Sequence, residues 1–131
     1  MIVLDASAAI ELLLGTDTGR TVSRRIAPSR ETLHAPHLID LEVAQVLRRY
    51  VGRGLLEEDR AIDALTDLQD LEIVRYAHDF LLPRVWELRA NATAYDAAYL
   101  ALSELLEAPL LTADARLARV PDARARVEVV R

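Results

Sequence analysis

The chain alternates short runs of apolar residues with longer stretches in which apolar residues recur every three or four positions. The short runs are typical of β-strands and the longer stretches of amphipathic helices. Strands are predicted at residues 2–4, 33–35, 73–76, 110–112 and 127–130. Helices are predicted at about residues 7–14, 18–26, 38–51, 57–71, 83–90, 95–107 and 115–120.

Strands separated by helices indicate βαβ units, and therefore an α/β fold with a parallel sheet covered on both faces. The 131 residues contain no repeat and no linker, so one domain spanning 1–131 is expected. In open sheets of this kind, ligands bind beyond the carboxyl ends of the strands, where the strand order reverses. Polar residues that follow strands are therefore the first candidates for a site.

The amino-acid composition limits the kinds of metal site and covalent cross-link that the chain can form. The chain has no cysteine, which excludes disulfides and thiolate metal sites. His34, His37 and His78 lack the spacing of a zinc site and are expected to be structural. The apolar start of the chain is interrupted by Asp5 and Glu11, is too short to span a bilayer and has no basic flank, so we expect a cytoplasmic protein without a membrane segment.

The formal net charge of −5 disfavours a general nucleic-acid binder. Every basic residue is an arginine, however, and arginine binds phosphate with two parallel hydrogen bonds. The arginines gather in three local groups, which are Arg24, Arg25 and Arg30, then Arg48, Arg49 and Arg53, then Arg116, Arg119, Arg124 and Arg126. Each group fits a phosphate-binding patch and ordinary solvated surface equally well.

Four carboxylates stand close to predicted strand ends or on helices that follow strands. They are Asp5, Glu42, Asp96 and Asp114. The three aspartates have a simpler explanation as helix caps. Glu42 projects from an apolar helix stripe, where a charge requires a partner, and either Arg49 or a metal ion would supply one.

Other conspicuous side chains have plainer explanations. Asp59, Asp63 and Asp67 repeat every four residues opposite apolar positions, which predicts a solvated stripe or a dock for a basic partner. Tyr95 and Tyr99 are expected in the core or at an interface rather than as platforms for nucleobases.

Four blocks of sequence together resemble one known family. The blocks are VLDASA at 3–8, LEV with VLR at 41–48, YDAAYLAL at 95–102, and LLTAD followed by RL at 110–117. In this order they resemble the PIN-domain ribonucleases, and among these the VapC toxins of bacterial toxin–antitoxin pairs. The resemblance implies a three-layer α/β/α sandwich with a central parallel sheet in the order 3-2-1-4-5.

The same resemblance implies a site and an activity. Asp5, Glu42, Asp96 and Asp114 would form an acidic quartet that binds Mg²⁺, or Mn²⁺ as a substitute, with Ser7 and Thr112 in support. Asp5 and Asp96 are expected to contact the ion directly, and the other two through water or at a second ion. The implied function is a Mg²⁺-dependent endoribonuclease toxin that leaves a 5′-phosphate and a 3′-hydroxyl. An RNA substrate, an antitoxin that inserts a basic side chain into the site, and a homodimer are implied as partners.

Alternative functions remain to be weighed. Response-regulator receivers and haloacid-dehalogenase phosphatases also place aspartates after strands, but both use a lysine, which this chain lacks. An inactive PIN-like module for binding or dimerisation, and a PIN nuclease of RNA maturation, stay open.

Overall fold

The computed structural model describes residues 1–28 and 30–131. One parallel sheet runs through the molecule in the order β3-β2-β1-β4-β5, which confirms the order implied by the resemblance. Its strands are β1 (Ile2–Leu4), β2 (Leu33–Pro36), β3 (Ile73–Tyr76), β4 (Leu110–Thr112) and β5 (Val127–Val129). Every strand pair is parallel.

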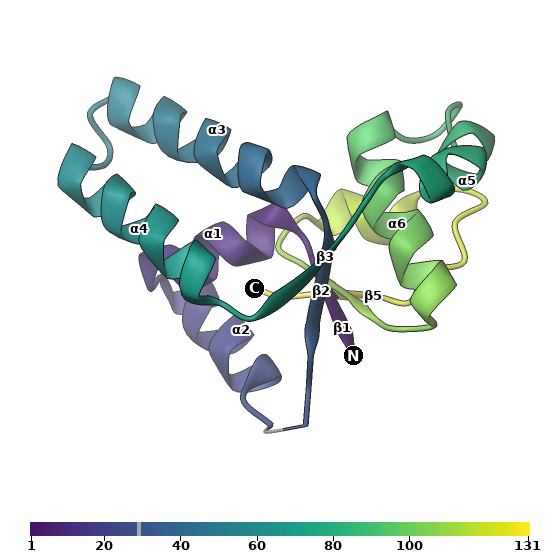
Figure 1. The fold of residues 1–131 in the computed structure, drawn as a ribbon, viewed down its shortest axis with the longest axis horizontal. Helices are drawn as coiled ribbons and strands as arrows, with labels where there is room; N and C mark the ends of the chain where they lie inside the picture. Colours follow the sequence, from purple (N-terminus) through teal and green to yellow (C-terminus); the bar gives the residue numbers. More distant parts are fainter. Residues whose placement is uncertain (29) are drawn as a thin grey trace.

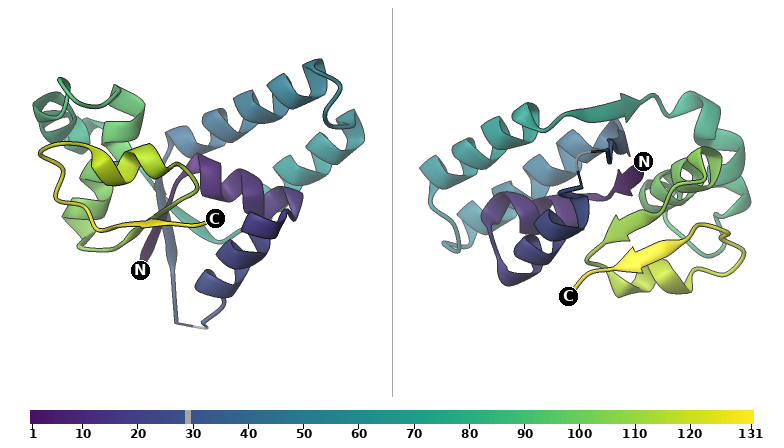
Figure 2. Two further views of the ribbon diagram at one scale, coloured as in Figure 1. Left: turned by 180° about the vertical axis from the view of Figure 1, so that it is seen from behind. Right: turned by 90° about the horizontal axis from the view of Figure 1, so that it is seen from below.

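Helices cover both faces of this sheet, as Figures 1 and 2 show. They are α1 (Ala6–Leu14), α2 (Asp17–Ile26), α3 (Leu38–Gly52), α4 (Glu58–Asp70), α5 (Leu82–Glu87) and α6 (Ala94–Leu106), with short 3₁₀ helices η1 (Asp79–Leu81) and η2 (Ala115–Arg119). Helices α1 to α4 lie on one side, and α5, α6 and η2 on the other. None of the helices in these described ranges is long and apolar enough to cross a membrane.

The strand order fixes where a site can form. The chain moves from β1 outward to β3, then crosses over through α5 and α6 and adds β4 on the other side of β1. Strands β1 and β4 are therefore neighbours whose connections leave in opposite directions, with Leu4 paired with Leu111. This is the switch point, where the carboxyl ends of two central strands leave a crevice open.

The core is built on the central strands. Ile2, Val3, Leu4 and Leu110 are fully buried, which is expected for strands with helices on both faces. Helix α6 is buried almost all round from Ala97 to Ser103. The element that carries Asp96 is therefore held rigidly against the sheet.

The structure departs from the predicted elements in a few places. The helix expected at 83–90 begins earlier, as η1, and continues as α5, which ends at Glu87. Pro83 lies in the first turn of α5, where its missing N–H costs no hydrogen bond. The helix expected at 115–120 is the 3₁₀ helix η2. On α4 the inward face is made by Ala61, Ala64 and Leu68, whereas Ile62, one of the apolar positions opposite the three aspartates of this helix, is 54% exposed.

Candidate active site

A pocket of about 440 Å³ opens at the carboxyl ends of β1 and β4, the edge that the strand order predicts. All four candidate carboxylates line it, and Ser7 lies beside them. The other side chains around it include Leu38, Leu41, Gln45, Arg49, Tyr95, Tyr99 and Arg116. Four acids separated by up to 109 positions, from 5 to 114, thus meet in one hollow.

Asp5 is the most buried of the four, at 5% exposure. It follows β1 directly and caps α1, since its Oδ1 accepts a hydrogen bond of 2.9 Å from the N–H of Ala8. The capping explanation is therefore correct, and the same carboxylate also lines the pocket. Burial raises its pKa, against the opposing effect of its hydrogen bonds, and Asp114 adds a repulsive contribution.

Ser7 and Thr112 hold Asp5 in place. The Ser7 hydroxyl donates to Asp5 Oδ1 at 2.8 Å, and the Thr112 hydroxyl donates to Oδ2 at 2.7 Å. The two hydroxyls also accept the backbone N–H groups of Ala113 and Asp114, each at 2.9 Å. This network ties the end of β4 to the start of α1 and fixes the orientation of the Asp5 carboxylate.

Glu42 reaches the pocket from α3 and is half-buried. Its partner is the Tyr99 hydroxyl, which donates to Oε1 at 2.7 Å; within the described residues Arg49 forms no ion pair with it. Burial raises the pKa of Glu42, the Tyr99 hydrogen bond opposes this rise, and the charges of Asp96 and Asp5 add to it. Tyr99 is buried, as expected for a core residue, but its bond to Glu42 was not predicted, although Tyr99 lies three residues after Asp96 and so shares a helix face with it.

Asp96 lies in the first turn of α6, but it is not the cap of that helix. The cap is Thr93, whose hydroxyl accepts the N–H of Asp96 at 3.1 Å. No backbone N–H of the described residues donates to the Asp96 carboxylate, so the explanation of Asp96 as a helix cap is wrong. Burial raises its pKa and Asp114 raises it further, whereas the charge of Arg116 and a side-chain hydrogen bond with Thr93 oppose the rise.

Asp114 differs from the other three acids. It accepts the N–H of Arg116 at 3.0 Å as the cap of η2, and the Arg116 guanidinium binds both of its carboxylate oxygens. Hydrogen bonding from Arg116 lowers the pKa of Asp114, against the opposing effect of burial. It is therefore the one acid of the quartet that already has a cationic partner.

The donors suit a hard divalent cation, because every candidate ligand is a carboxylate oxygen. Three of the acids have raised pKa values, for which burial and mutual repulsion are causes, and a cation would relieve both. Over residues 1–28 and 30–131, no three Asp, Glu, His or Cys side chains stand close enough together to hold an ion as they are. Mg²⁺ keeps several of its waters, so one or two direct carboxylate contacts satisfy it.

The remaining candidate groups lie outside this pocket. His34 is buried between the Thr32 hydroxyl and the Tyr76 hydroxyl, at 2.7 and 2.8 Å, which agrees with a structural role. Arg25 pairs with Glu128 across the sheet edge. Of the arginine groups, only Arg49 and Arg116 line the acidic pocket.

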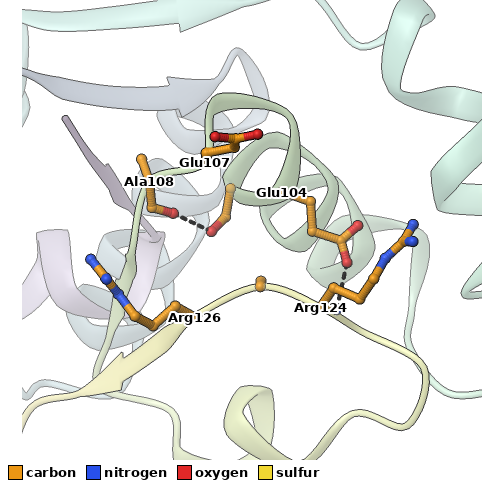
Figure 3. Close-up of a pocket in the computed structure, with 7 residues that line it drawn as sticks. Glu104, Glu107, Ala108, Arg124 and Arg126 are labelled. Atoms are coloured by element: carbon orange, nitrogen blue, oxygen red, sulfur yellow. Dashed lines mark hydrogen bonds between the residues drawn. The ribbon is translucent and has the colours of Figure 1, made fainter.

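A second hollow, of about 390 Å³, lies before the amino ends of β4 and β5 (Figure 3). Its two arginines, Arg124 and Arg126, point in opposite directions, and Glu107 points away from both. The Glu104 carboxylate accepts a hydrogen bond of 2.7 Å from Arg84 Nε and another from the backbone N–H of Arg124. Its charged side chains do not converge on a common point, in contrast to those of the acidic pocket.

Comparison with known proteins agrees with this geometry. The PIN domain family matches residues 2–123. The ribonuclease VapC9 of Mycobacterium tuberculosis is 42% identical over 130 residues, which cover 99% of this chain and 98% of that protein. Two crystal structures share the fold over the full length of both chains. They are M. tuberculosis VapC20, described as a Sarcin-Ricin loop cleaving toxin (TM-score 0.74, 16% identity), and VapBC2 of Rickettsia felis, bound to a DNA fragment from their promoter (TM-score 0.71, 13% identity). The chain therefore belongs to the PIN domain family and, within it, to the VapC ribonucleases.

Proposed function

We propose that this protein is a Mg²⁺-dependent endoribonuclease and the toxin of a toxin–antitoxin pair. The observation that carries the proposal is the convergence of Asp5, Glu42, Asp96 and Asp114 on one pocket at the switch point of the sheet. The name of VapC9 and the description of VapC20 as a toxin that cleaves the Sarcin-Ricin loop support the same activity.

The surroundings of each acid determine the role that it would have in binding the ion. Asp5 is fixed by three hydrogen bonds and would supply a rigid ligand, and Asp96 would reach the ion from the first turn of α6. Glu42 and Asp114 complete the negative wall. When bound, Mg²⁺ neutralises charge that develops on the phosphate and lowers the pKa of the attacking water.

Hydrolysis at this site adds water to phosphorus and breaks the bond to the 3′ oxygen. The water loses a proton, for which Glu42, with its raised pKa and its position on the pocket wall, is the acceptor. The leaving 3′ oxygen takes up a proton from solvent water, so the products are a 5′-phosphate and a 3′-hydroxyl.

The negative charge of the pocket also makes it a binding site for an inhibitory partner protein. An antitoxin that places a basic side chain among the four acids would block the cation and the substrate together. VapBC2 is named as a pair, which supports such a partner here. Co-expression with the protein encoded beside this one, followed by purification of the complex, tests the partner. Light scattering on the isolated chain tests the expected homodimer, and fractionation of cells tests the cytoplasmic location.

The activity is tested with purified protein and a set of structured RNAs in Mg²⁺ or in EDTA. Cleavage is expected in Mg²⁺ only, and Asp5→Asn is expected to abolish it while circular dichroism stays unchanged. Asp63→Asn is the matched control, because it removes the same charge from the exposed face of α4. Cleavage in EDTA would indicate another mechanism, and a protein that binds RNA without cleaving it would indicate a silent PIN-like module.

A further inference from the structure

Arg116 stands at the rim of the acidic pocket and holds one of its four acids. Its Nη2 lies 2.7 Å from Asp114 Oδ2, and its Nε lies 3.0 Å from Oδ1. Both carboxylate oxygens are therefore occupied by one guanidinium, in the paired geometry that arginine also uses for phosphate. While this pair is closed, the guanidinium charge opposes the binding of a cation at Asp114.

The pair is built to open. The Arg116 side chain is 85% exposed and the Asp114 side chain 24%, so water competes with the contact. Ion pairs as exposed as this contribute little to folding. Arg116 is also anchored through its backbone N–H, which Asp114 accepts, so the guanidinium can leave the carboxylate while η2 stays in place.

Once released from Asp114, the Arg116 guanidinium is placed to bind a phosphate that enters the pocket. Arg116 and Arg49 are the two basic residues that line the pocket in the described chain, and the rest of its charged wall is acidic. A phosphodiester that enters must pass an arginine, since the four carboxylates repel it until a cation is bound. Arginine forks match the geometry of phosphate oxygens better than a point charge does.

We propose that Arg116 is a positioning residue that exchanges Asp114 for the phosphate of the substrate, so that cation and phosphate bind cooperatively. This inference rests on the proposed function. Phosphate draws the guanidinium away and frees Asp114 for the cation; the cation attracts Asp114 and frees Arg116 for the phosphate. Coupling of this kind is reciprocal, so each ligand raises the affinity for the other by the same factor.

The test measures binding, not turnover. Uridine 5′-monophosphate serves as the phosphate probe, because it carries the expected product group and has no phosphodiester to cleave. The affinity for Mn²⁺ is measured by electron paramagnetic resonance with and without saturating nucleotide, after correction for Mn²⁺ bound by nucleotide alone. Four proteins are compared, namely the wild type, Arg116→Gln, Arg116→Lys and Arg119→Gln.

Arg119→Gln is the matched control. It removes the same charge from the same short helix η2, and the Arg119 side chain forms no ion pair within residues 1–28 and 30–131. Arg116→Lys keeps the charge and loses the fork, which separates paired hydrogen bonding from general attraction.

The wild type and Arg119→Gln should bind Mn²⁺ at least about fivefold more tightly in the presence of the nucleotide than in its absence. Arg116→Gln should bind Mn²⁺ alone more tightly than the wild type and the nucleotide more weakly, with the coupling lost, and Arg116→Lys should lose most of it. Absence of coupling in the wild type, or coupling that survives in Arg116→Gln, would overturn the exchange. Absence of RNA cleavage would overturn the proposed function and leave this binding result standing.

Discussion

The Tyr99 hydroxyl donates a hydrogen bond of 2.7 Å to Glu42 Oε1 and so joins α6 to α3 in the wall of the pocket. Tyr99 is 2% exposed, and its burial, followed by the charge of Glu42, raises the pKa of its hydroxyl, so it stays a donor at any ordinary pH. The bond offsets part of the cost of placing a negative charge on a half-buried glutamate. Glu42 is thereby held among the other acids without a cationic partner.

Tyr99→Phe removes this donor and should weaken cleavage by about tenfold, the lower end of the range for residues that orient a metal site. Because the hydrogen bond lowers the pKa of Glu42, its loss should raise that pKa and shift the rising limb of the pH–rate profile to higher pH. Tyr50→Phe is the control, since the structure gives Tyr50 no side-chain hydrogen bond among the described residues. An unchanged profile in Tyr99→Phe would show that this bond does not tune Glu42.

Asp96→Asn should abolish cleavage and stabilise the metal-free protein at pH 7, by roughly 0.5–1 kcal/mol. Burial raises the pKa of Asp96 in the folded state, so folding favours its protonated form. Its favourable contribution is complete below the pKa of the unfolded chain and is lost as the pH rises through the folded pKa. The variant's advantage in melting temperature, measured in EDTA, should therefore shrink as the pH falls to about 4. Asp63→Asn provides the reference, and an advantage that does not vary with pH would argue against a strained carboxylate.

Gly19→Ala should destabilise the protein by about 2 kcal/mol. A Cβ at Gly19 would overlap the carbonyl oxygen of Glu11, because α2 packs directly on the backbone of α1. Gly52→Ala is the paired control, since nothing lies within 4 Å of a Cβ added there, and it should be neutral or slightly stabilising. Urea denaturation of both variants measures the difference, and equal midpoints would mean that the two helices separate without cost.

The architecture was largely predictable, because apolar periodicity reports burial and burial is what arranges the layers. The short run at residues 2–4 is fully buried as β1. The switch between β1 and β4 is also present, but it was implied by the family resemblance and not by periodicity. Boundaries shifted where local chemistry decides them. Pro83 fits the first turn of α5, and the short segment after Asp114 closes as a 3₁₀ helix.

The acids of the site were predictable as candidates, but their partners were not. Glu42 and Tyr99 lie 57 positions apart, and no local pattern connects them. Periodicity placed Glu42 on an apolar stripe and left open Arg49 or a metal ion, whereas the three-dimensional packing supplied a hydroxyl. In the sequence Arg116 was one member of a local group of four arginines, and only the fold shows that it holds Asp114.

The central claim is that the four carboxylates share one hard cation, and anomalous diffraction from a crystal soaked in Mn²⁺ tests it most directly. A Mn²⁺ peak is expected in the pocket, in contact with the carboxylates of Asp5 and Asp96, and it should be absent from an Asp5→Asn crystal. A protein that cleaves RNA while Mn²⁺ binds only elsewhere, such as along Asp59, Asp63 and Asp67 of α4, would contradict the account.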